Sequence, residues 1–181
     1  MKFRELTKKQ KLKYLWDYYK LPIFGALVGI YILLSLLFRF LNRTEPVVYV
    51  ALVNVSGSIA EDGSLTSGYL DTREALPEKA EVVLYKNLYL TADEGSEFFV
   101  YSEASEMKLI GSIRAKKLDV VIADQEAFEA FREQGYLAET ARISESALLK
   151  SYGYTDPIYA GIIRNTPRPE EAGKYLSYLK K

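Results

Sequence analysis

Cysteine and histidine are both absent from this chain of 181 residues. Without cysteine there is no disulfide, no thiolate nucleophile, no lipid attachment through a thiol and no cysteine zinc site. Without histidine the Ser-His-Asp triad, the Cys-His pair and the usual imidazole metal ligands are excluded. The folded part of the chain must therefore be held together by its hydrophobic core alone.

The sequence also lacks a Gly-rich phosphate loop, a G-x-S-x-G elbow and any metal-ligand spacing. Neighbouring acids such as Glu61 with Asp62 suit hydrolysis or cation binding in principle, but such pairs are more often part of a solvated loop. We predict a protein that is not an enzyme and that holds no cofactor and no metal. A hydrolase that uses Asp or Glu is the enzymatic alternative.

Acidic and basic residues are distributed unevenly, although the formal net charge is zero. Residues 1–44 hold nine Lys or Arg and two acids, a net charge of +7, whereas residues 45–181 hold 15 basic and 22 acidic residues, a net charge of −7. Nucleic-acid binding needs clustered Lys and Arg for phosphate contacts. The acidic part therefore predicts no nucleic-acid partner.

A long apolar run, Leu21–Phe38, contains no charged residue. At about 1.5 Å per residue it spans most of the hydrocarbon core of a bilayer, which predicts a transmembrane helix over 21–41. The excess of Lys and Arg before it predicts a cytoplasmic basic tail, residues 1–20, by the positive-inside bias. After a tether at 42–45, residues 46–181 are expected outside the cytoplasm, so that the protein is a single-pass protein of the cell membrane.

A cleaved signal peptide is the alternative to a retained anchor. The apolar run is longer than the roughly 7–15 residues of a typical signal-peptide core, and bulky residues (Phe38, Arg39, Phe40 and Leu41) stand where small residues should mark cleavage. These two features favour retention, with the lipid bilayer as a partner.

The residues around the apolar run suggest further membrane contacts. Aromatic residues precede it as an expected belt at the membrane interface: Tyr14, Trp16, Tyr18 and Tyr19. This segment forms either a short helix on the inner leaflet or a helical extension of the anchor, which Pro22 would permit near a helix start. Gly25 and Gly29 form a small-xxx-small pair that would suit a homodimer.

Residues 46–181 alternate between strand-like and helix-like segments, which predicts one α/β domain. Its expected sheet has about four to five strands, is mostly parallel and is flanked by helices. The expected strands are 46–55, 80–90 with a kink near Lys86 and Asn87, 118–124 and 158–164. The expected helices are 65–76, 103–117, a helix after Asp124 that stops at Gly135, 144–151, and a last helix that begins at Pro169.

Several apolar faces follow from helical spacing. The helix at 103–117 is expected to bury Met107, Leu109, Ile110 and Ile113, and the helix after Asp124 is expected to bury Ala127, Phe128 and Phe131. The last helix has the stripe Ala172, Tyr175, Leu176 and Leu179.

Ligands of open α/β sheets favour the carboxyl ends of parallel strands. The candidate binding residues at this edge are Asn54, Ser56, Asp124 and Gln125. The structural alternative is that Asp124 simply caps a helix and that Ser56 belongs to a turn. In the loop before the last strand, Tyr152 and Tyr154 are candidates for contact with another protein.

Two segments resemble a known family. Met107–Leu137, MKLIGSIRAKKLDVVIADQEAFEAFREQGYL, and Ile158–Leu179, IYAGIIRNTPRPEEAGKYLSYL, are similar to one lobe of bacterial extracellular solute-binding proteins of ABC importers. That family usually has two lobes and a lipidated cysteine, and no ligand-contact motif of the family is present here. The resemblance implies one lobe-like α/β domain, and no binding residue is carried over.

Together these features predict a bacterial single-pass membrane protein with a non-catalytic binding or accessory domain, associated with an ABC-type transporter or another membrane protein. The alternative from the same class is a minimal membrane-tethered solute receptor.

Overall fold

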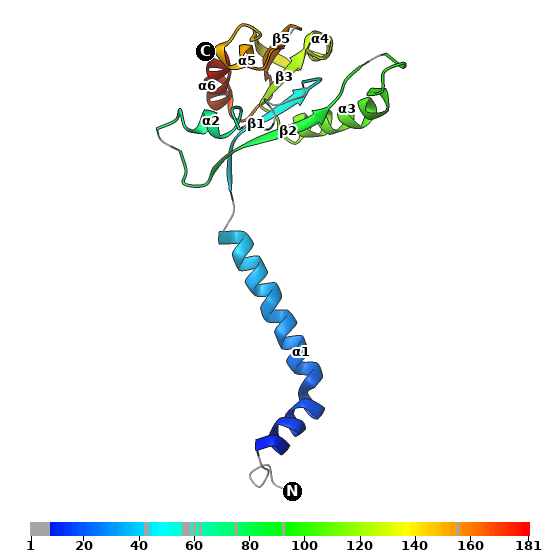
Figure 1. The fold of residues 1–181 in the computed structure, drawn as a ribbon, viewed down its shortest axis with the longest axis vertical. Coiled ribbons are helices and arrows are strands. Elements are labelled where there is room, and N and C mark those ends of the chain that lie inside the picture. Colours follow the sequence, from blue (N-terminus) through cyan, green and yellow to red (C-terminus); the bar gives the residue numbers. More distant parts are fainter. Residues whose placement is uncertain are drawn as a thin grey trace. The chain divides into compact units, whose positions relative to one another are not determined.

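The computed structural model describes residues 8–41, 44–55, 59, 61, 63–74, 76–91, 93–154 and 156–181. The chain divides into two compact units, Met1–Arg43 and Thr44–Lys181. Figure 1 shows the elements of both units in order along the chain.

The first unit contains one helix, α1, Lys8–Leu41. Its segment Lys20–Phe38 is long and apolar enough to cross a membrane, a property that signal sequences near an N-terminus share. Since α1 runs without a break from Lys8, the basic segment continues the apolar helix, as one of the two alternatives predicts. Pro22 lies inside α1 instead of near its start, and it removes one backbone donor from the helical ladder.

The second unit is an α/β domain around a five-stranded mixed sheet with strand order β2-β1-β3-β5-β4. Strand β1 is parallel to β2 and β3, whereas β5 is antiparallel to β3 and β4. The strands are β1 Glu45–Val53, β2 Ala80–Leu88, β3 Val120–Asp124, β4 Leu137–Arg142 and β5 Ile158–Ile163. The helices are α2 Ser67–Leu70, α3 Phe99–Arg114, α4 Gln125–Glu133, α5 Ala147–Lys150 and α6 Pro169–Leu179. The α/β class and the mostly parallel sheet are confirmed.

The sheet carries a hydrophobic core on each face, because β1 and β3 are apolar at almost every position. Successive residues of β1, such as Leu52 and Val53, point into opposite cores. One core includes residues of α2, α5 and α6, and the other includes residues of α3 and α4. Figure 1 shows α2 and α6 on one side of the sheet and α3 on the other.

Several expectations for individual elements are confirmed. The Asp124 carboxylate caps α4 by accepting a hydrogen bond from the Ala127 backbone N–H at 2.9 Å, and Gly135 ends that helix with φ +70°. The expected kink in β2 lies at Asn87, whose φ is +55° and which falls within a shift of register between β1 and β2. All of the apolar residues predicted for α4 and α6 are buried: Ala127, Phe128, Phe131, Ala172, Tyr175, Leu176 and Leu179.

The helix predicted at 65–76 is wrong in length, because only Ser67–Leu70 is helical. The Tyr69 carbonyl accepts hydrogen bonds from both the N–H and the hydroxyl of Thr72, at 3.0 and 2.7 Å, which closes the helix with a tight turn. The predicted burial of Met107 is also wrong, since its side chain is 70% exposed. Strand β4 was not predicted, because it is a sheet edge on which only Leu137 is buried.

Candidate functional site

At the carboxyl ends of β1 and β3, the structure brings two of the candidate residues, Asn54 and Asp124, together. The Asn54 amide donates to the Asp124 carboxylate at 3.0 and 3.1 Å and to the Leu90 carbonyl at 2.7 Å, and its oxygen accepts from the Leu90 N–H at 2.8 Å. These bonds use both the donors and the acceptor of the Asn54 amide. They join the end of β1, the segment at Leu90 and the end of β3. The geometry favours the structural alternative for Asp124.

None of the other candidate residues that the structure describes forms a hydrogen bond with Asn54 or Asp124. Gln125 is exposed at the start of α4, and Ser56 lies outside the described residues. Tyr152 and Tyr154 pack, half-buried, against the core that contains α6, and the Tyr152 hydroxyl lies 2.7 Å from the Ser64 hydroxyl. Burial raises the pKa of Tyr154.

The expected membrane contacts lie on α1. Trp16 is 66% exposed, whereas the side chains of Tyr14, Tyr18 and Tyr19 lie outside the described part of the structure. A methyl group placed on Gly25 or Gly29 would meet nothing within 4 Å, so this face of α1 is open.

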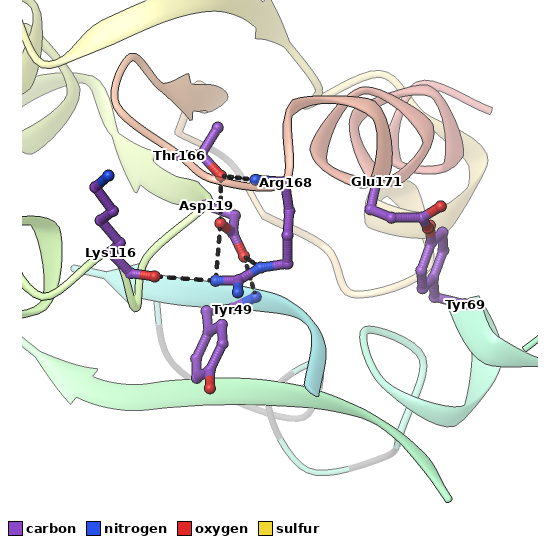
Figure 2. Close-up of polar contacts among 7 residues, drawn as sticks. All are labelled: Tyr49, Tyr69, Lys116, Asp119, Thr166, Arg168 and Glu171. Carbon is purple, nitrogen blue, oxygen red and sulfur yellow. Dashed lines mark hydrogen bonds and ion pairs between the residues drawn. The ribbon is translucent and has the colours of Figure 1, made fainter. Parts of the chain in front are cut away.

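A buried ion pair that the sequence analysis missed lies at the amino end of β3 (Figure 2). Asp119 has no solvent exposure, and its carboxylate accepts hydrogen bonds from the Tyr49 backbone N–H at 2.8 Å and from Arg168 Nε at 2.9 Å. The Thr166 hydroxyl and Arg168 Nη2 donate to the second carboxylate oxygen. Four donors thus satisfy the carboxylate, as a buried charge requires.

Arg168 is held in turn by further contacts. Its Nη2 donates to the Lys116 carbonyl at 3.1 Å, and its guanidinium lies 4.6 Å from the centre of the Tyr49 ring. The Tyr49 ring stacks on Tyr85. The Asp119 carboxylate has no acceptor left for a substrate, and the contacts of this cluster tie β1, β3 and the start of α6 together. An acid beside the apolar run Val120–Ala123 was the one signal for it in the sequence.

Glu171 of α6 forms a second charged cluster, with Arg73 at 2.9 Å and Lys174 at 2.7 Å. Burial alone would raise the pKa of Glu171, but the hydrogen bond from Lys174 and the positive charges of Arg73 and Lys174 outweigh burial and lower it. The same carboxylate accepts from the Tyr69 hydroxyl at 3.4 Å, and burial, with the negative charge of Glu171, raises the pKa of Tyr69 to about 12.

A groove between α3 and α4 remains open to solvent. Its main cavity of about 330 Å³ has an apolar floor that includes Leu109, Ile113, Ala127 and Phe131. Its remaining lining residues include four glutamates: Glu106, Glu126, Glu129 and Glu133. Leu90 and Thr91 also line it, and the Leu90 carbonyl accepts a hydrogen bond from Asn54 of the Asn54–Asp124 pair. This groove thus lies next to the edge that the sequence indicated, but different residues line it.

A second cavity of about 330 Å³ continues the groove beyond Gln134 and Tyr136, which line both cavities. Arg114, Arg164 and Asn165 line this extension. Arg164 Nη2 donates to the Leu137 carbonyl at 3.1 Å, and the Asn165 amide donates to the Ile113 carbonyl at 3.2 Å. The groove therefore has an acidic part and a basic end.

No group of three or more acidic side chains in the described part of the chain could hold a metal ion. No protein-family model and no curated protein sequence matches this chain. The fold and the groove define the second unit as an α/β domain with an open, charged groove on the α3–α4 face of its sheet.

Proposed function

We propose that this chain is a single-pass membrane protein whose α/β domain lies outside the cytoplasm and acts as a non-catalytic binding module, with the groove between α3 and α4 as its binding site. The groove carries the proposal, because it combines an apolar floor with polar groups on its walls, as binding sites commonly do. The apolar segment Lys20–Phe38 and the basic residues before it support membrane anchoring in this orientation.

The polar clusters elsewhere in the domain support a binding role over a catalytic one. The Asp119 carboxylate is saturated by four donors, and Asp124 is engaged by Asn54 and Ala127. A general acid or base must reach the substrate proton within hydrogen-bond distance. Neither Asp119 nor Asp124 presents a free carboxylate to the groove, so these two residues do not support an Asp-dependent hydrolase.

Cross-linking in intact cells tests the binding site. A photoreactive residue in place of Ala130, which lines the groove, should form adducts with the bound molecule, whereas the same residue in place of the exposed Ala138 on β4 should not. Equal adduct yields at the two positions, or none at Ala130, would contradict the proposal. An adduct with a transporter subunit would support the accessory role that the resemblance to solute-binding proteins suggests.

A minimal solute receptor is the second candidate. The cavity of about 330 Å³ lies at the lower end of the size range of small-molecule pockets, roughly 300–1,000 Å³. A solute that raises the melting temperature of the full-length chain, and that loses this effect when Ala130→Trp fills the groove, would favour the receptor. Failure of every class of solute tested would favour a protein partner.

A further inference from the structure

The walls of the main cavity carry negative charge. Glu126, Glu129 and Glu133 recur along one face of α4, and Glu106 faces them from α3. No lysine or arginine is among the described residues that line this cavity. Glu129 pairs with Arg132 of the same helix, but no ion pair holds Glu106 or Glu133 in the described structure. A bound group of positive charge would therefore meet the uncompensated carboxylates of Glu106 and Glu133.

The sign of the charge reverses at the other end of the groove. Arg114, the last residue of α3, and Arg164, just after β5, both line the second cavity. The apolar floor continues between the two ends through Ile110 and Ile113. A ligand that fills the whole groove thus meets acids along most of its length and arginines at one end.

The length of the groove favours an extended occupant. The lining residues of α3 run from Ser102 to Arg114, which corresponds to about 18 Å, or roughly three helical turns. One row of apolar side chains on a helix of that length would lie along the floor. A second copy of this chain is disfavoured as the occupant, because its residues 45–181 carry a net charge of −7 and would repel the same acidic domain. Under the proposed topology its basic residues before Leu21 lie on the other side of the membrane.

From these observations we propose that the groove receives a cationic amphipathic helix of a partner protein, with the carboxyl end of that helix at Arg114 and Arg164. The inference rests on the proposed function of the groove. Lysine or arginine residues beside the apolar row of the partner helix would pair with Glu106 and Glu133. In this direction the negative end of the partner's helix dipole faces the two arginines, and its positive end faces Glu126.

A labelled peptide of about 14 residues, with leucines at helical spacing, flanking lysines and a glutamate in its last turn, is the probe. Its binding to the full-length chain in nanodiscs of zwitterionic lipid is measured by fluorescence anisotropy, with empty nanodiscs as the background. Compared with this peptide, a variant in which glutamates replace the lysines should bind at least about tenfold more weakly. A variant with the glutamate moved to its first turn should also bind more weakly. Equal binding of the charge-reversed peptide would overturn the inference.

Two double variants separate the groove from the general charge of the domain. Glu106→Lys with Glu133→Lys should weaken binding of the cationic peptide at least about tenfold, and Glu78→Lys with Glu145→Lys, which changes the net charge equally at exposed sites elsewhere, should change it less than about twofold. Similar weakening by both would overturn the inference. Circular dichroism checks that each variant is folded.

Filling the groove gives an independent readout. Ala130→Tyr should abolish peptide binding, since the added ring occupies the floor, and undiminished binding would overturn the inference. Cross-linking at Ala130 distinguishes failure of the cationic-helix proposal from failure of the groove as a binding site. Adducts with a small solute, or with a partner segment that is neither basic nor helical, would overturn the cationic helix but retain the groove as the binding site.

Discussion

Asp119 is the centre of a buried polar cluster that joins β1, β3 and the start of α6. Its carboxylate has no solvent exposure, yet four donors from Tyr49, Thr166 and Arg168 surround it. Replacing a well-paired buried acid by its neutral amide leaves the partner arginine without its counterion, and such changes are strongly destabilising. The cluster therefore contributes to stability only while it is complete.

We predict that Asp119→Asn lowers the free energy of unfolding by about 3 kcal/mol, at the lower end of the range for broken buried pairs because Arg168 keeps some contact with water. Urea denaturation followed by circular dichroism measures this change. Asp71→Asn, at an exposed position, is the matched control and should change stability by less than about 0.5 kcal/mol. Equal effects of the two substitutions would contradict the structural role of Asp119.

Glu171 makes the free energy of unfolding of the domain depend on pH in the acidic range. Since the folded state lowers the pKa of Glu171 below 4.5, its ion pairs stabilise the fold above that pH, and the contribution is lost as the pH falls through the folded pKa. We predict that Glu171→Gln costs about 1 kcal/mol at pH 7 and has a smaller effect at about pH 3. Denaturation curves at both pH values measure the difference. A constant cost at both would show that charge on Glu171 is not the cause.

At the scale of elements, Asp124 connects the end of β3 to the start of α4. We predict that Asp124→Ala costs about 1–2 kcal/mol, because the cap of α4 is lost and the Asn54 amide loses an acceptor. Gln125→Ala, at the adjacent exposed residue, should be almost neutral and serves as control. Urea denaturation of both variants measures the two changes in the free energy of unfolding. An unchanged stability with loss of ligand binding would instead assign Asp124 to a ligand site.

Elements with strong local signals could be predicted from the sequence. The last helix has a proline at its start and a complete apolar stripe, and α4 has its cap, its inward face and its glycine stop within the twelve residues 124–135. By contrast, β4 has one buried residue, Leu137, and gains its place by pairing with β5. Tertiary pairing of this kind leaves no periodic pattern in a single sequence.

The groove, like β4, depends on tertiary contacts that a single sequence does not show. Its two walls, α3 and α4, are separated along the chain by β3, and their glutamates become neighbours only because both helices pack on one face of the sheet. The sequence placed the candidate residues Asn54 and Asp124 at the end of the sheet where Leu90, which lines the groove, bonds to Asn54. It could not show that Asn54 and Asp124 would satisfy each other and leave the adjacent groove open.

At the scale of the whole molecule, the two units have opposite charges. The segment 1–44 carries +7 and the segment 45–181 carries −7, with the apolar segment Lys20–Phe38 between most of these charges. A cationic segment is retained on the cytoplasmic side of a membrane, whereas an acidic domain contributes little to orientation. Under the proposed topology, a cationic partner helix for the groove would belong to a protein outside the cytoplasm or to an exposed loop of a membrane protein.

The absence of cysteine allows this topology to be measured directly, since each introduced cysteine is the sole thiol of the chain. We predict that a membrane-impermeant maleimide labels Glu145→Cys in intact cells, and labels Lys2→Cys only after the membrane is permeabilised, because the basic segment is retained inside. The mass of the purified chain should include residues 1–38. Labelling of Lys2→Cys in intact cells would contradict the orientation, and a mature chain that lacks the apolar segment would show that it is a signal sequence. If the apolar segment is a signal sequence, the groove would remain available on a released domain. The peptide-binding measurements would then still test the groove, whereas the proposal of a membrane anchor would be wrong.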